Sequence, residues 1–300
     1  MLIEKLEQLF GILKDKEKKR LIVAWAVDAH TIEAVNEAVD LGLVYATLVG
    51  DRQTIMKRCE ELNIDAGKFV IDQVSSDSEA AERSVSLINE GKGNMIMKGN
   101  LGTEKYMKAI LNKESGLMVP NEILSHVAVV ENPVYHKLMI ISDAAIIPLP
   151  DLKQKIAQTC HLINTAKAIG LEKPKVALIA ATEQPSPNMP ASTDAAVISK
   201  MAERGRFGNA FVEGPLALDL AVDKVSADIK GIKSEVAGDA DCLLFPNIES
   251  GNIFYKTNSK LAAGEQGAIV VGAKVPVVLS SRGDTSKTKL YSIALAAITA

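Results

Sequence analysis

The sequence contains few cysteines and few aromatic residues. Cys59, Cys160 and Cys242 are scattered and odd in number, so they form neither a disulfide framework nor a metal-binding spacing, and they favour a reducing cytoplasm. Aromatic residues make up 4% of the chain and the net charge is −3, which leaves few platforms for stacked bases and no basic field for phosphates. The composition therefore argues against a disulfide-rich secreted protein and against nucleic acid as a partner.

Several motifs that mark enzyme classes are also absent. The chain has no GxxxxGK[ST] phosphate loop, no GxGxxG after its first expected strand, no HExxH and no GxSxG. Its histidines show no metal spacing, and we expect no metal cofactor. The N-terminal stretch carries acidic residues and lacks a small-residue cleavage site, so we expect neither a signal peptide nor a membrane partner.

What the chain does contain is a regular alternation of short apolar runs and amphipathic patterns. Of its 300 residues, 47% are hydrophobic and 24% are charged, which is enough to bury a large core. Apolar strands that alternate with helices predict an α/β fold with mostly parallel sheets and helices on both faces. The expected strands are 21–27, 43–49, 95–97, 127–130, 138–141, 176–180, 210–212, 242–245, 268–271 and 275–279. The expected helices are 31–41, 52–62, 77–90, 102–112, 151–169, 193–204, 250–263 and 286–299.

Two domains are expected, because 300 residues is long for one compact domain. The one break in composition lies between Glu131 and Pro150, where prolines bracket an apolar strand. We expect the chain to return to the first domain near residue 276. The first α/β domain would then comprise residues 1–135 and 276–300, and the second would comprise residues 136–275. We expect the ligand in a cleft between these domains, lined by loops at strand ends.

The C-terminal segment carries the strongest signal for a binding site. The apolar run Pro276–Leu279 stops at a polar stretch that ends in Thr285, and an amphipathic helix follows. The first amides of a helix carry partial positive charge, and the guanidinium of Arg282 is a planar fork suited to phosphate. The pattern predicts an anion site, and the alternative is that Ser281 and Thr285 only turn and cap the chain.

Two further strand ends place polar groups before helices. Lys98 is followed by two glycines and is a candidate phosphate ligand, with an ordinary surface lysine as the alternative. In a later helix, Asn252, Tyr255 and Lys256 are spaced to lie on one face. Gly251 in the first turn of that helix is costly unless something approaches the backbone closely, so a ligand there and an ordinary helix start are equally favoured.

A stiff loop and two acidic residues give weaker signals. Prolines fix the loop Gln184–Asp194, in which Asn188 is a candidate substrate contact or part of a well-built connection. Glu213 and Asp219 follow the next expected strand and are either carboxylates of the cleft or ordinary caps.

Five segments of the sequence are recognisable together. They are LSHVAVVENPVYHKLMIISDAA (124–145), NMPASTDAAVISKM (188–201), VEGPLALDLAV (212–222), CLLFPNIESGNIFYK (242–256) and VVGAKVPVVLSSRGDTSKTKLYSIALA (270–296). With these segments the chain resembles the phosphate acetyl/butyryltransferase family, and its butyryltransferase branch most of all. The resemblance covers about two thirds of the chain.

The resemblance implies reversible transfer of a butyryl or branched short acyl group between coenzyme A and inorganic phosphate, which gives acyl phosphate. Coenzyme A would be a substrate, with no tightly bound cofactor and no metal. The resemblance also implies a fold similar to that of isocitrate and isopropylmalate dehydrogenases, and a cytoplasmic homodimer. Acyl chain length and physiological direction stay open.

The resemblance further places Ser281 and Arg282 at the reaction centre. Acetyl-specific relatives carry an aspartate seven residues after this serine, where this chain has Thr288, so Asp284 is the nearest carboxylate. Where those relatives have an arginine and a cysteine, this chain has a histidine and an alanine. The candidate catalytic residues are Ser281, Arg282 and Asp284, and the candidate substrate contacts are Lys98, His126, Asp143, Asn188, Asn252, Tyr255, Lys256 and Gly283.

Other functions remain as alternatives. The first is a phosphate acetyltransferase, and the second is a non-catalytic protein that binds acyl-CoA or acyl phosphate. A phosphate acyltransferase that uses acyl carrier protein would need a basic docking patch, which is not evident. A dehydrogenase on the similar fold is disfavoured because no acidic cluster for a metal is visible.

Overall fold

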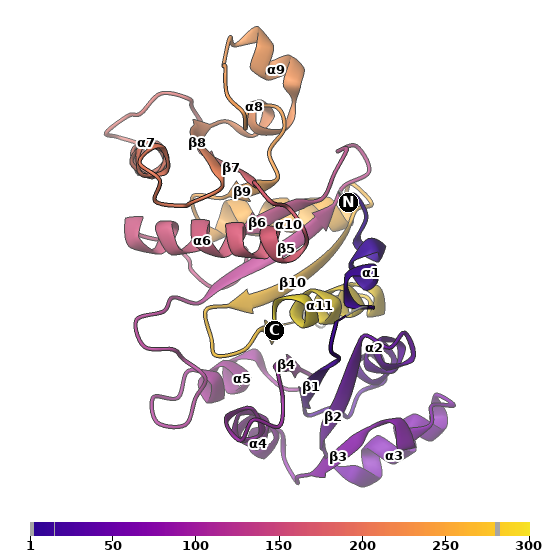
Figure 1. Ribbon diagram of the computed structural model, residues 1–300. Helices are drawn as coiled ribbons and strands as arrows, with labels where there is room; N and C mark the ends of the chain where they lie inside the picture. Colours follow the sequence, from indigo (N-terminus) through magenta and orange to yellow (C-terminus); the bar gives the residue numbers. More distant parts are fainter. Residues whose placement is uncertain (1–2, 15, 280–282) are drawn as a thin grey trace. The chain divides into compact units, whose positions relative to one another are not determined.

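The computed structural model describes residues 3–14, 16–279 and 283–300, and the chain divides into two compact units. The terminal unit comprises Glu7–Glu122 with Gly267–Ala300, and the central unit comprises the segment up to Leu6 with Ile123–Gln266. Both are α/β units, as Figure 1 shows, so the expected fold class is confirmed.

The chain passes into the central unit at Ile123 and leaves it after Gln266, earlier than the expected boundaries at 136 and 276. The reason for the first difference is a strand pairing. Strand β5 (Ser125–Glu131) pairs antiparallel with β6 (Met139–Ser142), and these hydrogen bonds place β5 in the central unit. Whether a ligand cleft lies between the domains stays a prediction.

The terminal unit is built on a largely parallel sheet with the order β3-β2-β1-β4-β11-β10. Only β10 and β11 pair antiparallel among these strands in the described part of the unit. The strands are β1 (Lys19–Ala24), β2 (Val44–Gly50), β3 (Val70–Gln73), β4 (Met95–Lys98), β10 (Glu265–Val271) and β11 (Val277–Val278). The helices are η1 (Leu6–Gln8, at the boundary between the units), α1 (Leu9–Leu13), α2 (Ala29–Asp40), α3 (Arg52–Glu61), η2 (Ala66–Lys68), α4 (Asp77–Asn89), α5 (Thr103–Ile110) and α11 (Ser286–Thr299).

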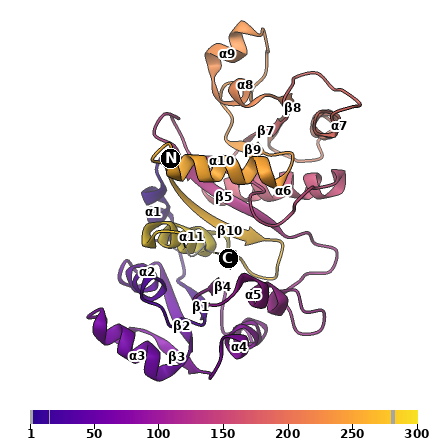
Figure 2. The same ribbon diagram turned by 180° about the vertical axis from the view of Figure 1, so that it is seen from behind.

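The order of strands decides which helices cover which face of this sheet. From β1 the chain steps outward through β2 to β3, and right-handed crossovers put α2 and α3 on one face. The return from β3 to β4 runs the other way, so α4 lies on the opposite face, with α5 beside it (Figures 1 and 2). The sheet is therefore covered on both sides, as its apolar strands require.

Helix α11 has the bounds expected from the sequence but not the expected exposure. We predicted an amphipathic helix, whereas every residue from Lys289 to Ile298 is buried. The helix packs against α1 and α2 on one side and against β4 and β11 on the other. After its first turn it is a core helix, and its last buried residues are small or aliphatic because no side of that part meets solvent.

The central unit has the strand order β5-β6-β9-β7-β8, parallel except for β5 with β6. Helices α6 and α10 lie on opposite faces of this sheet, as the two views in Figures 1 and 2 show. The remaining strands are β7 (Lys175–Ile179), β8 (Phe211–Leu216) and β9 (Cys242–Leu244). The helices are α6 (Leu152–Ala168), α7 (Pro190–Glu203), α8 (Leu218–Val222), α9 (Lys224–Ile229) and α10 (Ile248–Lys260).

Several short elements were not predicted from the sequence, among them β3, α8 and α9. Strand β3 is short, lies at the edge of its sheet and is half-exposed, so it has no continuous apolar run. Helices α8 and α9 are five and six residues long, too short for a helical repeat to show.

Candidate functional site

In the terminal unit, the candidate site lies where three neighbouring strands end. Strands β1, β4 and β11 are adjacent and parallel, with Ala24 opposite Lys98 and Met97 opposite Val278. The next strands after β1 in the sequence, β2 and β3, lie on one side of it, and β4 lies on the other side. The strand order therefore reverses between β1 and β4. In open α/β sheets, ligands bind at the carboxyl ends of the strands at such a point.

The turns after β1 and β4 are joined through their backbones. Trp25 directly follows β1 and has a φ of 56°, a left-handed conformation that is uncommon for a large residue. The Gly99 N–H donates to the Ala24 carbonyl at 2.8 Å, and the Asn100 N–H donates to the Trp25 carbonyl at 2.9 Å. Trp25 was not among the residues predicted from the sequence, because a positive φ at a tryptophan leaves no trace there.

Lys98 is not the surface lysine that was the alternative to a ligand. The residue is only 4% exposed, and its Nζ donates to the carbonyls of Gly99 and Leu101 at 3.2 and 3.1 Å. The ammonium group therefore sits inside the turn that follows β4. The positively charged side chain is thus fixed close to the carboxyl end of β4.

The predicted anion site around Arg282 follows β11 in the sequence. Ser281 and Arg282, two of the three candidate catalytic residues, lie outside the described residues, whereas Gly283 is exposed and Asp284 is half-buried. The Thr285 Oγ accepts a hydrogen bond from the Thr288 N–H at 3.1 Å, which confirms that Thr285 caps α11. The first turn of α11 contains no acidic residue.

In the central unit, a second group of candidate residues gathers around Asp143. This residue follows β6, is 2% exposed and accepts four backbone hydrogen bonds. Its Oδ1 accepts from Ala145 and Ile146 at 2.8 and 2.9 Å, and its Oδ2 accepts from His126 and Ile147 at 3.0 and 3.3 Å. The carboxylate thus holds the turn after β6 against the start of β5, and its acceptor positions are already used.

His126 connects this turn to helix α10. Its ring meets the ring of Tyr255 edge-on, with centroids 5.7 Å apart, and both residues are buried. One turn earlier in α10, the Asn252 Nδ2 donates to the Ala144 carbonyl at 3.0 Å. Lys256 is exposed, with its Nζ 5.5 Å from the centroid of the Tyr255 ring. The structure therefore brings together His126, Asp143, Asn252, Tyr255 and Lys256.

The close approach that Gly251 requires is made by the protein itself. A Cβ at Gly251 would lie 2.2 Å from the carbonyl oxygen of Asp143. The glycine lets the first turn of α10 pack directly on the turn after β6. The sequence argument for a close contact was sound, but this contact is with the chain's own backbone.

The remaining candidates of the central unit lie elsewhere in it. Asn188 is exposed in the loop between β7 and α7. Glu213, in β8, is half-buried, and burial raises the pKa of its carboxyl group despite hydrogen bonds from Ser234 and the Gly214 N–H.

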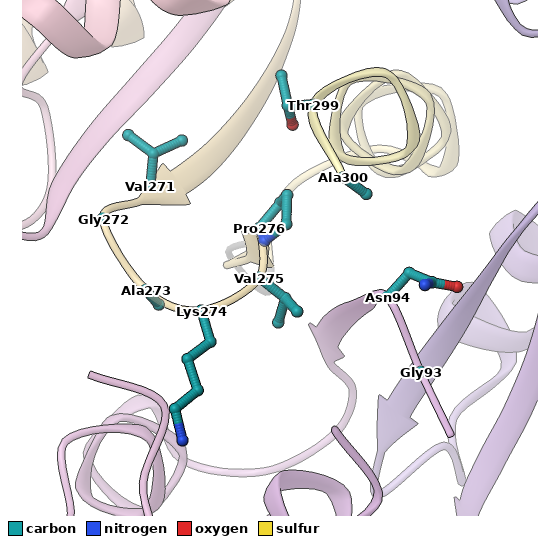
Figure 3. Close-up of a pocket in the computed structure, with 10 residues that line it drawn as sticks. All are labelled: Gly93, Asn94, Val271, Gly272, Ala273, Lys274, Val275, Pro276, Thr299 and Ala300. Atoms are coloured by element: carbon teal, nitrogen blue, oxygen red, sulfur yellow. The ribbon is translucent and has the colours of Figure 1, made fainter. Parts of the chain in front are cut away.

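A pocket of about 390 Å³ in the terminal unit contains none of the predicted residues. Figure 3 shows Asn94 and the loop around Lys274 on its wall. The Lys274 Nζ is engaged with Asn89 Oδ1 at 2.8 Å and with the Gly116 carbonyl at 3.4 Å. The pocket lies at the amino end of β4, away from the strand ends that carry Lys98 and Gly283.

Within residues 3–14, 16–279 and 283–300, no three or more His, Cys, Asp or Glu side chains are grouped so that they could hold a metal ion. Within the same ranges, every helix is too short or too polar to cross a bilayer.

Comparison with known proteins assigns the chain to a family. The model of the phosphate acetyl/butaryl transferase family matches residues 78–297. The chain belongs to this family of phosphate acyltransferases. It is 42% identical to the phosphate butyryltransferase of Clostridium acetobutylicum, over 100% of this chain and 99% of that protein. It is 40% identical to the phosphate acetyltransferase of Thermotoga maritima, over 98% of this chain and 99% of that protein.

Solved structures agree with this assignment. A branched-chain phosphotransacylase from Enterococcus faecalis superposes with a TM-score of 0.82 at 29% identity, over 94% of this chain and 98% of that chain. A 4-hydroxythreonine-4-phosphate dehydrogenase from Burkholderia phymatum matches with a TM-score of 0.53 at 14% identity, over 95% of this chain and 99% of that one. The second likeness concerns the fold alone, and it confirms the expected similarity to the isocitrate/isopropylmalate dehydrogenase-like fold.

Proposed function

We propose that this protein transfers a butyryl or another short or branched acyl group reversibly between coenzyme A and inorganic phosphate, forming acyl phosphate. The observation that carries the proposal is 42% identity to a phosphate butyryltransferase over the whole chain. The family match spans residues 78–297 and so includes every candidate site residue, from Lys98 to Asp284.

The proposed reaction is nucleophilic acyl transfer. In the direction that consumes acyl phosphate, the coenzyme A thiolate forms a bond to the carbonyl carbon, because the thiolate and not the thiol is the nucleophile. The tetrahedral intermediate then expels phosphate, which takes the electron pair of the carbon–oxygen bond. The protein must therefore accept a thiol proton, stabilise an oxyanion and hold a phosphate.

We assign these tasks to the turn before α11. Arg282 and the first amides of α11 bind phosphate, and Ser281 donates a hydrogen bond to the oxyanion or the sulfur. Asp284 accepts the thiol proton, directly or through a water molecule. The absence of acidic residues from the first turn of α11 supports this choice, since Thr288 stands where acetyl-specific relatives carry their aspartate. In the same region, Lys98 supplies positive potential. Gly283 has no side chain and so lets the substrate approach the backbone closely.

In the central unit, we propose that His126, Asn252, Tyr255 and Lys256 contact the substrates. Asp143, first expected as a substrate contact, is better suited to positioning, because four backbone N–H groups occupy its carboxylate. It fixes the backbone of His126 at the start of β5. Asn188 is retained as a substrate contact on the basis of sequence alone.

Phosphate acetyltransferase is the second candidate function, since the Thermotoga maritima enzyme of that name is 40% identical over nearly the whole chain. A non-catalytic acyl-CoA or acyl phosphate binder is the third.

We also propose that the protein is a cytoplasmic homodimer. Light scattering of the purified protein would test the dimeric state.

The deciding experiment is a substrate panel. Purified protein is incubated with phosphate and with acyl-CoAs of two to five carbons, straight and branched, and free thiol is followed with time. We expect the highest kcat/KM for butyryl-CoA or a branched homologue. A maximum at acetyl-CoA would establish the second function, and saturable binding without thiol release would establish the third.

A further inference from the structure

A basic groove lies at the amino end of the sheet in the terminal unit, far from the proposed acyl-transfer site. It includes Lys18 and Arg20 of the charged run Lys16–Arg20. In the structure α1 already ends at Leu13, and Lys19 and Arg20 are the first residues of β1. The run therefore leads into the amino end of an interior strand, and its function needs a separate explanation.

Three strands and one helix form the groove. Arg20 of β1 stands opposite Tyr45 of β2, and Thr47 of β2 stands opposite Val70 of β3, on the face that α4 covers. Because α4 ends at Asn89, the first residues of these strands stay uncovered. They enclose a cavity of about 540 Å³ in which Tyr45 and Val70 are 52% and 53% exposed.

The cations around this groove are unequally paired. Arg83 binds Asp72 and Glu90, both at 2.9 Å, and Lys92 binds Glu90 at 2.7 Å. Lys18 and Arg20, by contrast, have no acidic partner in the described part of the chain. The two nearby carboxylates are already engaged, so the groove carries surplus positive charge.

Lys18 and Arg20 are held in place by neutral groups. The Lys18 Nζ and the Arg20 Cζ lie 5.6 and 5.4 Å from the centroid of the Tyr45 ring. The Arg20 Nη1 also donates to the Thr47 Oγ1 at 3.5 Å, a long hydrogen bond. Two cations beside one ring raise the positive potential there, and a bound anion would lower it. A phosphate fits, since a guanidinium and an ammonium are its usual protein ligands.

The apolar surface of the groove defines the rest of the ligand. The ring of Tyr45 and the side chain of Val70 are exposed beside the cations, and an inorganic ion would leave both uncovered. A planar base attached to a phosphate would cover them and contact the cations together.

We propose that the basic groove of Lys18, Arg20, Tyr45, Thr47 and Val70 is a nucleotide-binding site. Lys18 and Arg20 hold the phosphates, and Tyr45 with Val70 packs against the base. The site is separate from the acyl-transfer site, because β1 spans six residues, or about 20 Å, between its two ends. The proposal does not depend on which acyl group the protein transfers.

The test uses the full chain and adenosine diphosphate as the probe, titrated by calorimetry at low salt without coenzyme A, because coenzyme A carries an adenosine diphosphate group that would itself enter the groove. Binding of the probe at the acyl-transfer site is separated from binding at the groove by variants that change the groove alone. The variant Lys18→Gln/Arg20→Gln should lose at least tenfold in affinity. Its matched control, Lys57→Gln/Lys113→Gln, removes the same charge from exposed positions of the same unit and should bind as the parent does.

Two further arms separate a nucleotide site from a simple anion site. Tyr45→Ala should weaken adenosine diphosphate at least fivefold and leave pyrophosphate affinity unchanged, whereas Tyr45→Phe should bind both normally. Acyl transfer without added nucleotide should be unaltered in all these variants, which shows that they fold. Equal binding of adenosine diphosphate by the parent and the Lys18→Gln/Arg20→Gln protein would overturn the proposal. So would no detectable binding, or binding of pyrophosphate alone.

Discussion

Gly99 lies directly against the backbone of Trp25. A Cβ at residue 99 would come within 2.5 Å of the Trp25 carbonyl oxygen and 2.7 Å of the Ala24 carbonyl oxygen. The Asn100 N–H bonds to the same Trp25 carbonyl at 2.9 Å. The turn that buries the Lys98 ammonium therefore depends on a glycine, because no side chain fits between β1 and β4 at this point.

Gly99→Ala should lower both stability and activity. The added methyl group must push apart two backbones, and overpacking of this kind costs about 1–3 kcal/mol in the free energy of unfolding. Urea denaturation measures the loss. Gly11→Ala is the matched control, because nothing lies within 4 Å of a Cβ there, and it should be neutral or stabilising. Equal stability of both variants would contradict the tight contact.

Trp25 should report ligand binding through its fluorescence. It is the only tryptophan in the chain and stands at the point where the strand order reverses, half-buried beside β4. Coenzyme A or acyl phosphate bound at these strand ends should shift or quench its emission, and Trp25→Phe should abolish the signal. A saturating kinetic response with no spectral change would place the substrates elsewhere.

Asp143→Asn should be strongly destabilising. The amide keeps one acceptor oxygen but sets an NH₂ group against backbone N–H donors, which leaves buried groups unpaired at a cost of about 2–4 kcal/mol. Asp51→Asn provides the comparison, because Asp51 caps α3 through one N–H and asparagine caps equally well. If Asp143→Asn kept full stability and lost only activity, the carboxylate would be a direct substrate ligand rather than a positioning group.

Arg282→Ala should reduce kcat by about a hundredfold and raise KM for phosphate, since both the phosphate and the developing charge lose a donor. Arg282→Lys should recover only part of the activity, because an ammonium keeps the charge but not the fork. Arg206→Ala, at an exposed position of the central unit, serves as the control. Unchanged rates in both directions for Arg282→Ala would remove the arginine from the mechanism.

Stability should fall in acid through Asp239. Burial alone would raise the pKa of this carboxyl group, but hydrogen bonds from Lys137 and Lys175 outweigh it and hold the pKa well below 3.8. Because the pKa of Asp239 is lower in the folded state, the ionised carboxylate stabilises the folded protein at pH values above the pKa of the unfolded state. That contribution disappears as the pH falls below about 4. Asp239→Asn should thus cost about 1 kcal/mol at pH 7, allowing for a side chain that is 38% exposed, and less at pH 3.

Urea titrations at both pH values measure this difference. Asp228→Asn, in an exposed pair with Lys224, should show almost no effect at either pH. A difference between wild type and Asp239→Asn that grew in acid would contradict the assigned sign.

The sequence by itself determined most of the secondary structure. The expected helices at 286–299 and 52–62 correspond to α11 (Ser286–Thr299) and α3 (Arg52–Glu61). The alternation of apolar strands and helices was enough to predict an α/β fold. These features follow from local periodicity, which any short stretch of chain carries within itself. The cap formed by Thr285 is equally local, because its partner is three residues away.

Only the tertiary structure decided what those elements touch. The β5–β6 pairing moved the boundary between the units, and the buried position of Lys98 excluded a surface role. The four hydrogen bonds of Asp143 come in part from His126, and the contact that requires Gly251 comes from Asp143 itself. The β5–β6 pairing, the His126 hydrogen bond and the Gly251 contact join residues that lie beyond one another's local sequence, and no periodicity records which distant backbone will fill a given space. The residue type shows which chemistry a side chain can perform. Whether that side chain is free to contact a ligand depends on the neighbours that surround it in the folded protein.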